Sequence, residues 1–230
     1  MLNIAEFLLL NNRLIISLFC WAFTCNVKAQ PPQFSIATDL DLQRNFSSGQ
    51  SYWAFGHTIQ GQFHLAMKDA VYVWLSYYTN GKFRNEVVAT AKSPLTSPQQ
   101  LRYTNQAKMG TRQFSIGWKK WLKGVYNAES SWNLYSYAGF GLLFGNVVNT
   151  HSIPIDTMDY LVPVRSGEGK FKRLTADLGL GIEIPLGAEI YLYTEARTWL
   201  PVSDYPSKYL FKNENAPVYG FFNAGIRILF

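Results

Sequence analysis

The stretch that decides the fold is residues 174–200, LTADLGLGIEIPLGAEIYLYTEARTWL. In its first half, 174–184, apolar side chains stand at even positions, and Thr, Asp, Gly and Glu stand at odd positions. In its second half, 188–200, the apolar set is again even-numbered, and Tyr, Glu and Arg dominate the odd positions. Alternation with a period of two gives a strand two chemically different faces, because successive side chains point to opposite sides. Cross-strand partners share a face, so an even-numbered residue of one strand must pair with an even-numbered residue of the other. This requires an odd number of residues in the turn, and a three-residue turn at 185–187 fits.

The same alternation recurs along the chain. Each alternating segment has about 9–13 residues, which exceeds the usual strand length of about 5–6 and suits a tilted transmembrane strand. A helix with these patterns would scatter its apolar residues around its axis. The sequence therefore predicts eight strands, an even number, at 34–42, 57–67, 71–79, 112–121, 132–144, 174–184, 188–200 and 218–230.

The connections between these strands alternate in length. Tight turns are expected at 68–70 and 185–187, and an intermediate connection at 123–130. Longer connections fall at 44–56, 80–111, 145–173 and 201–217. Short turns on one side and long loops on the other are typical of outer-membrane barrels. A soluble β-sandwich, the alternative all-β fold, has no reason to alternate its loops in this way.

The composition excludes several other classes. The 230 residues are 48% hydrophobic, 16% aromatic and only 16% charged, against about 25% charged in a typical soluble protein. A mean hydropathy of -0.06 excludes a polytopic helical membrane protein, and the aromatic content argues against disorder. A secreted all-β domain and a membrane β-barrel remain.

Residues 1–29 are interpreted as a secretory signal peptide. Arg13 precedes an apolar core at 14–25, which is too short to span a bilayer as a helix, and 27–29 provides a cleavage site. The mature domain is then 30–230. Both cysteines, Cys20 and Cys25, lie in the leader, so the mature chain has no disulfide, thiolate metal site or cysteine nucleophile. A membrane anchor and a lipoprotein acylated at Cys25 are the alternatives.

In a small membrane barrel the apolar face meets lipid and the polar face fills the interior. Opposite charges crowded inside an eight-stranded barrel are expected to pair, which leaves no open pore. The predicted interior network consists of Asp39, Asp41, His64, Lys119, Asp177, Glu183, Glu189, Glu195, Arg197 and Arg227. Aromatic girdles at the membrane boundaries are expected from residues that include Tyr52, Tyr77, Phe144 and Trp199 at one end and Trp118, Trp121, Tyr126 and Trp132 at the other.

With its leader, its eight alternating strands and its terminal Phe230, the chain resembles the small outer-membrane β-barrels of the OmpA/OmpX type. The resemblance implies an eight-stranded antiparallel up-and-down transmembrane barrel in the outer membrane of a Gram-negative bacterium, with the Bacteroidota type as the expected origin. It also implies that the last strand carries the signal read by the barrel-assembly machinery. The residues that match this signal are Phe222, Ile226, Ile228 and Phe230.

Catalytic chemistry is not expected, although small outer-membrane barrels include lipid-modifying enzymes. The mature histidines are His57, His64 and His151. His64 is expected to lie near Ser76 and Trp74 in the interior, and no Ser/His pair at a lipid-facing position can be assembled. Asp39 and Asp41 share a face and form a cation site, an acid/base pair or, more simply, interior ion pairs with Arg or Lys on a neighbouring strand. No metal or cofactor is predicted.

The expected function is that of a non-enzymatic structural or accessory subunit, or of a surface-binding protein that uses the loops 80–111 and 145–173. The first loop is basic, with Lys82, Arg84, Lys92, Arg102 and Lys108 against Glu86. Expected partners are outer-membrane lipids, lipopolysaccharide, the barrel-assembly machinery and other envelope proteins. The mature chain carries a dispersed net charge of +5 and no nucleic-acid motif, so nucleic acid is excluded. A lipid-modifying enzyme, a narrow channel and a secreted sandwich are the alternatives.

Overall fold

The computed structural model describes residues 33–187, 189–203, 207–211 and 217–230, which belong to one compact unit. The predicted leader, 1–29, lies outside the described residues. The described residues contain no helix long and apolar enough to cross a membrane. Their regular structure is entirely β: β1 (Gln33–Asn45), β2 (Tyr52–Ala66), β3 (Asp69–Tyr78), β4 (Gly81–Ala91), β5 (Gln100–Lys123), β6 (Asn133–His151), β7 (Tyr160–Leu161), β8 (Gly167–Gly187), β9 (Ile190–Pro201) and β10 (Tyr219–Leu229).

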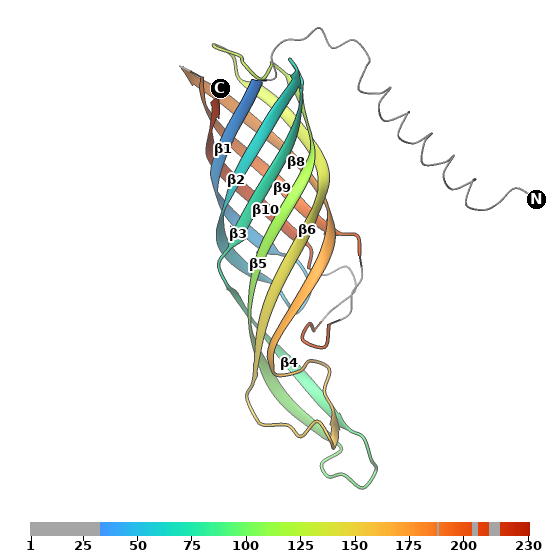
Figure 1. Cartoon of the computed structure of the whole chain (residues 1–230). Coiled ribbons are helices and arrows are strands. Elements are labelled where there is room, and N and C mark those ends of the chain that lie inside the picture. The colour runs from blue at the N-terminus through green and yellow to red at the C-terminus, as the bar shows by residue number, and fades with distance from the viewer. Residues whose placement is uncertain (1–32, 188, 204–206, 212–216) are drawn as a thin grey trace, which may run out of the picture. The chain divides into compact units, whose positions relative to one another are not determined.

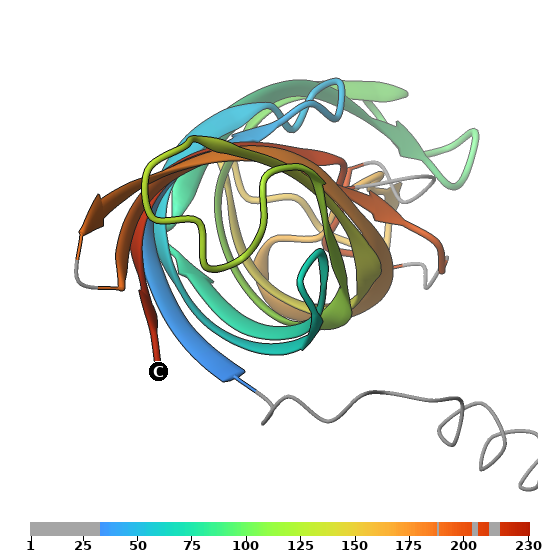
Figure 2. The same cartoon turned by 90° about the horizontal axis from the view of Figure 1, so that it is seen from above.

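Eight of these strands close into a barrel (Figures 1 and 2). The order β3-β2-β1-β10-β9-β8-β6-β5 is completed by pairing between β3 and β5. All the pairs are antiparallel, and the first strand joins the last through partners such as Ser35 and Leu229. Closure gives each strand of the ring two hydrogen-bonded neighbours, so the membrane-spanning part has no open edge. The predicted eight-stranded antiparallel barrel is confirmed.

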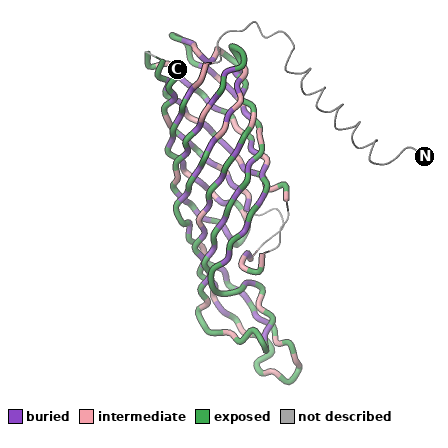
Figure 3. The backbone as a smooth tube through the Cα atoms, in the orientation of Figure 1, coloured by how far each residue is buried: buried purple, intermediate pink, exposed green. Residues whose placement is uncertain are grey.

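Burial alternates along each strand of the barrel (Figure 3). Outward side chains are large and apolar: Leu40 is 76% exposed, Phe140 62% and Leu180 56%. Polar and charged side chains fill the inside. This arrangement reverses that of a soluble sandwich and gives the barrel the apolar belt that lipid requires.

The aromatic girdle was only partly predicted. Tyr77, Phe144, Trp118 and Trp132 are exposed and face outward, as expected. Four of the other expected girdle residues are instead buried in the interior: three stand at strand positions of interior parity, and Tyr126 belongs to the connection after β5. These four are Tyr52, Trp121, Tyr126 and Trp199.

The two tight turns differ from the sequence prediction in their construction. Only residues 67 and 68 connect β2 to β3, and the register shifts between His64 and Ala66. At the β8–β9 connection the register shifts between Pro185 and Gly187. Each bulge adds one unpaired residue to a two-residue turn and so preserves the predicted parity. The three-residue turns were therefore wrong, although the pairing they were meant to explain is correct.

The long connections are not simple loops, and this is the main correction to the sequence analysis. β4 and the first part of β5 form a hairpin within 80–111, with partners from Gly81 and Met109 to Thr90 and Gln100. The ends of β6 and β8 continue their own pairing within 145–173. We call these four strand segments, 81–91, 100–110, 145–151 and 167–173, the distal sheet. It lies at the end of the barrel opposite the C-terminus (Figure 1).

The chemistry of the two faces reverses where the strands leave the barrel. On β5, outward positions change from Ile116 and Phe114 to Lys108 and Arg102, while inward positions change from Gln113 to Met109. The phase of the alternation does not change. The reversal follows from the surroundings, because the outer face meets lipid along the barrel and water beyond it. The membrane boundary on this strand therefore lies near Arg112.

Candidate functional site

The barrel interior holds two buried charge clusters. In the first, Arg197 on β9 donates hydrogen bonds to Asp39 and Glu195, each at 2.7 Å. Tyr193 donates to Asp39 at 2.8 Å, and Tyr135 donates to Glu195 at 2.6 Å. Arg197 thus links carboxylates on two strands that are not adjacent in the sheet, β1 and β9, across the interior.

The second cluster lies nearer the chain termini. Arg227 donates to both oxygens of Glu183, at 2.8 and 3.1 Å, and Nζ of Lys119 lies 3.7 Å from the same carboxylate. Arg227 also donates to the backbone oxygen of Tyr126 at 2.7 Å. Tyr126 belongs to the connection after β5, and Figure 2 shows this connection folded across the barrel end. The cluster therefore fastens a loop over the opening.

Nine of the ten residues expected in the interior network are buried. Asp41 accepts hydrogen bonds from Thr58 and Tyr78, and Asp177 accepts from Gln113 and Thr175. The tenth, Glu189, is exposed and was assigned wrongly. It lies in the turn before β9, with φ of 67°, because the bulge in β8 moves the start of β9 to Ile190.

Several interior partners were missed when the network was predicted. Ser35, Tyr135, Tyr193 and Arg173 are all buried, and the first three bond directly to network residues. Interior parity would have found Ser35, Tyr135 and Tyr193, which stand on the polar faces of predicted strands, whereas Arg173 lies in a segment that the sequence analysis took for a loop. What the parity does not reveal is which neighbour each side chain reaches.

His64 has a different partner from the one expected. Its Nε2 lies 2.6 Å from Oγ of Ser35, whereas Ser76 bonds to Thr58. Arg227 donates to the same Oγ at 3.0 Å, so the serine hydroxyl bonds to both the guanidinium and the imidazole. The ring of Tyr126 stacks on His64 with centroids 4.3 Å apart. A Ser–His pair is a possible nucleophile and base, but this one is enclosed by its neighbours.

The remaining histidines lie apart from this pair. His57 is exposed on the outer face, and His151 at the end of β6 packs against Tyr103 with ring centroids 4.6 Å apart. Burial lowers the pKa of His151, which is therefore neutral at pH 7. Among the described residues there is no group of three or more His, Cys, Asp and Glu side chains placed to hold a metal ion.

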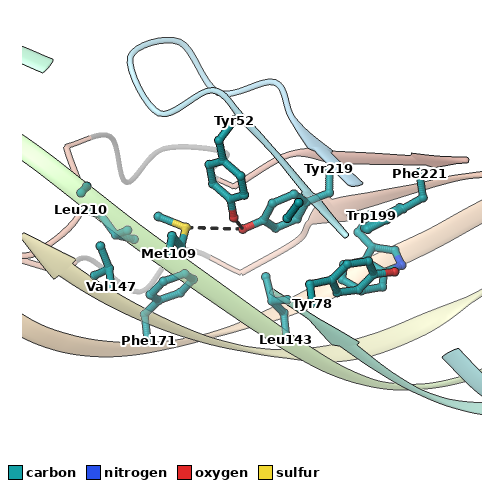
Figure 4. Close-up of a cluster of buried hydrophobic side chains, with 12 residues drawn as sticks. Tyr52, Tyr78, Met109, Leu143, Val147, Phe171, Trp199, Leu210, Tyr219 and Phe221 are labelled. Atoms are coloured by element: carbon teal, nitrogen blue, oxygen red, sulfur yellow. Dashed lines mark hydrogen bonds between the residues drawn. The ribbon is translucent and has the colours of Figure 1, made fainter. Parts of the chain in front are cut away.

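Aromatic side chains close the interior at both ends. At the distal end, a cluster that includes Tyr52, Tyr78, Trp199, Tyr219 and Phe221 packs against Met109 and Leu143 (Figure 4). The hydroxyls of Tyr52 and Tyr219 lie 3.0 Å apart, and Tyr219 donates to Sδ of Met109 at 3.5 Å. A second cluster, with Tyr72, Trp74, Trp121, Tyr126 and Tyr191, occupies the other end.

The distal sheet has one covered face and one free face. Its inner face carries Val87, Ala89 and Tyr103, which pack with Tyr160 and with side chains that include Ile155 and Phe211. On the β4–β5 hairpin its outer face carries four exposed cations and one exposed acid, Glu86, which accepts a hydrogen bond from Thr104 at 2.9 Å. The four cations are Lys82, Arg84, Arg102 and Lys108.

No family model matches the chain, and no curated protein matches its sequence. Solved structures match its fold. Neisserial surface protein A aligns with a TM-score of 0.54 and 13% identity, over 85% of this chain and 96% of that one. The attachment invasion locus protein Ail of Yersinia pestis aligns with a TM-score of 0.47 and 11% identity, over 87% and 100%. The N-terminal β-barrel domain of OprF from Pseudomonas aeruginosa aligns with a TM-score of 0.46 and 12% identity, also over 87% and 100%.

At these identities the likeness concerns the fold alone. The protein is a small eight-stranded β-barrel of OmpA/OmpX-like architecture. Its outward apolar belt and its polar interior place it in the bacterial outer membrane, in contact with outer-membrane lipids. A Bacteroidota origin stays a prediction.

Proposed function

We propose that this protein is a non-enzymatic surface-binding barrel, and that the distal sheet is its binding platform. The observation that carries the proposal is the exposed outer face of the β4–β5 hairpin of this sheet, where four cations stand against one acid. Short turns join the strands at the opposite end, so the distal sheet is expected outside the cell. The proposed partners are anionic macromolecules of the cell surface, with lipopolysaccharide foremost.

Packing contacts within the protein, rather than a bound ligand, hold the platform in its conformation. Its inner face is covered by the segment 152–166 and by Phe211, and the side-chain amide of Asn85 donates to the backbone oxygen of Gly49 in the β1–β2 turn. Ordering these strands in advance reduces the conformational entropy lost on binding. The outward cations therefore keep fixed spacings, because they alternate along strands in defined register: Lys82 stands opposite Lys108, and Arg84 opposite Gln106.

We expect the full-length protein in phosphatidylcholine vesicles to bind dextran sulfate and not neutral dextran. The triple variant Lys82→Ala/Arg84→Ala/Arg102→Ala should weaken this binding by about tenfold or more, since each surface cation contributes about 1 kcal/mol toward an anionic surface. Added salt should weaken the wild type more than the variant.

The matched control is Lys120→Ala/Lys123→Ala, which removes cations at the other end of the barrel. Faster migration of unboiled samples on an SDS gel verifies that each variant is folded, since all backbone hydrogen bonds of a barrel are internal. Equal binding by the wild type and the triple variant would refute the platform.

An accessory subunit is the second candidate, and a separate observation favours it. The far end of the distal sheet exposes Leu95 (94%), Met158 (80%) and Leu161 (65%). Large exposed apolar side chains are a feature of protein interfaces. Another envelope protein is the partner that would fit this tip.

The alternatives have less support. A lipid-modifying enzyme needs a base and a nucleophile on the lipid-facing surface. The histidine on that surface, His57, stands opposite Leu40 and Tyr77 in the sheet register, and neither of these partners is a serine. A narrow channel needs an unobstructed interior, whereas the guanidinium of Arg197 lies 4.6 Å from the ring centre of Trp74.

We further propose that β10 and Phe230 carry the assembly signal. Phe222, Ile226, Ile228 and Phe230 are all exposed on the outer face, where another protein can contact them during insertion. Replacing Phe230 by Ala should reduce the amount of heat-modifiable barrel in outer membranes by about half or more, while Leu40→Ala, an equally outward change on β1, should have little effect. Unchanged assembly of Phe230→Ala would argue against this role.

A further inference from the structure

A row of alternating aromatic and cationic side chains crosses four strands where the barrel meets the distal sheet. Sheet register places Tyr77 opposite Arg112, Arg112 opposite Phe144, and Phe144 opposite Lys172. All four side chains face outward and are exposed. The Arg112 guanidinium lies 5.3 Å from the ring centre of Tyr77, and Nζ of Lys172 lies 5.7 Å from that of Phe144. We call these four residues the rim row.

The rim row separates an apolar surface from a polar hollow. The next outward row toward the centre of the barrel is entirely apolar and consists of Leu75, Phe114, Leu142 and Leu174. On the other side of the rim row lies a hollow of about 760 Å³, whose lining includes Asn80, Gly110, Asn146 and Lys170. Apolar, cationic and hydrogen-bonding groups thus follow one another along the membrane normal.

Among the described residues, the charge at this place is predominantly positive. Arg112, Lys170 and Lys172 surround the hollow, and Glu168 is the one acid in its lining. Each of the three cations is exposed, and none takes part in the ion pairs found among the described residues. Cationic side chains at the level of the rim row can bind phosphate groups strongly, and Arg can do so with two parallel hydrogen bonds.

We propose that this hollow binds the phosphorylated sugar headgroup of an outer-leaflet glycolipid, the lipid A part of lipopolysaccharide. Its phosphates contact Arg112, Lys170 and Lys172, and its acyl chains lie on the apolar row below. Asn80 and Asn146 offer hydrogen bonds to the sugar hydroxyls. The inference rests on the proposed surface-binding function and deepens it, because it assigns one ligand class to cations distinct from the four on the β4–β5 hairpin.

Charge complementarity selects this occupant. A protein partner would have to lie at the membrane surface and place its own acidic side chains opposite these cations. A lipid with a phosphorylated sugar already holds its phosphates at the membrane surface, at the level of the rim row. A phospholipid also carries a phosphate, but it lacks the sugar that the polar hollow can accommodate. The rim row lies between the apolar belt and the hollow. The acyl chains of the glycolipid can therefore lie on the belt while its headgroup occupies the hollow.

The test uses the full-length barrel in a neutral detergent, titrated with bisphosphorylated lipid A, with dephosphorylated lipid A and with phosphatidylglycerol. We expect the wild type to bind bisphosphorylated lipid A at least about tenfold more tightly than the other two lipids. The triple variant Arg112→Ala/Lys170→Ala/Lys172→Ala should lose this preference, and Lys120→Ala/Lys123→Ala should retain it. The gel shift of unboiled samples verifies folding of every variant.

Equal affinity for all three lipids, or an unchanged preference in the triple variant, would overturn the proposed site. The platform variant Lys82→Ala/Arg84→Ala/Arg102→Ala separates the two proposals. It should lose dextran sulfate binding and keep its preference for bisphosphorylated lipid A. Failure of the lipid titration alone leaves the platform standing, and failure of dextran sulfate binding alone leaves the rim site standing.

Discussion

Replacing Arg197 by Leu should lower the free energy of unfolding by about 3–5 kcal/mol, the usual cost of removing one partner from a buried ion pair. Arg197 is the cation that pairs with both Asp39 and Glu195, and the exposed fractions of these carboxylates are 4% and 2%. Without it, two negative charges remain in the interior with only tyrosine hydroxyls as partners among the hydrogen bonds described. Urea unfolding in lipid vesicles, followed by tryptophan fluorescence, measures the change.

Two other substitutions serve as controls for Arg197. Arg227→Leu should cost less, because Lys119 stays 3.7 Å from Glu183 and continues to compensate its charge. Arg112→Leu removes an exposed cation and should change stability by less than about 0.5 kcal/mol. A loss at Arg197 no larger than that at Arg112 would show that the interior cluster contributes nothing to the stability of the barrel.

Replacing Phe140 by Arg should destabilise the barrel by about 2–4 kcal/mol, the cost of a cation on the lipid face near the bilayer midplane. Phe140 is 62% exposed and stands on β6 between Ile116 and Ala176, both outward-facing neighbours in the sheet register. The same unfolding measurement in vesicles applies. In a soluble sandwich with this residue on its surface, an Arg at the same position would be harmless.

The control for Phe140 lies on the same strand and the same face. Thr150 is also outward and exposed, but it belongs to the distal sheet, beyond the level of the rim row. Thr150→Arg should therefore leave stability within about 0.5 kcal/mol of the wild type. Similar effects of the two substitutions would contradict the assigned membrane boundary, because that boundary alone distinguishes the two sites.

The sequence by itself determined the barrel and its orientation of faces. Alternation is a local property, since the side chains of residues i and i+2 share a face of a strand whatever that strand pairs with. Leu174, Leu178 and Leu180 therefore mark one apolar face without any knowledge of the fold, and the prediction of a barrel makes it the lipid face. The even number of segments and their parity then predicted antiparallel neighbours with matching faces, but not their register.

The same local signal failed where the surroundings change. On β5 the outward side chains change from apolar, as at Phe114, to cationic, as at Lys108, while the alternation of burial continues without a break. A search for apolar outward residues therefore ends the strand at the membrane boundary. The distal sheet was consequently taken for loops. Its small inward residues, such as Ala89 and Ala107, weaken the alternation further.

Only the tertiary structure decided which interior groups meet. Ser35 and His64 are 29 positions apart in the chain and meet through the pairing of β1 with β2. Arg197 and Asp39 are 158 apart and meet because β1 pairs with β10 and closes the ring. The rim row likewise needs the register of β3, β5, β6 and β8. Periodicity assigns a side chain to a face, but its neighbours depend on strand order, bulges and stagger. These are long-range properties, and so the faces were predictable from the sequence while the contacts were not.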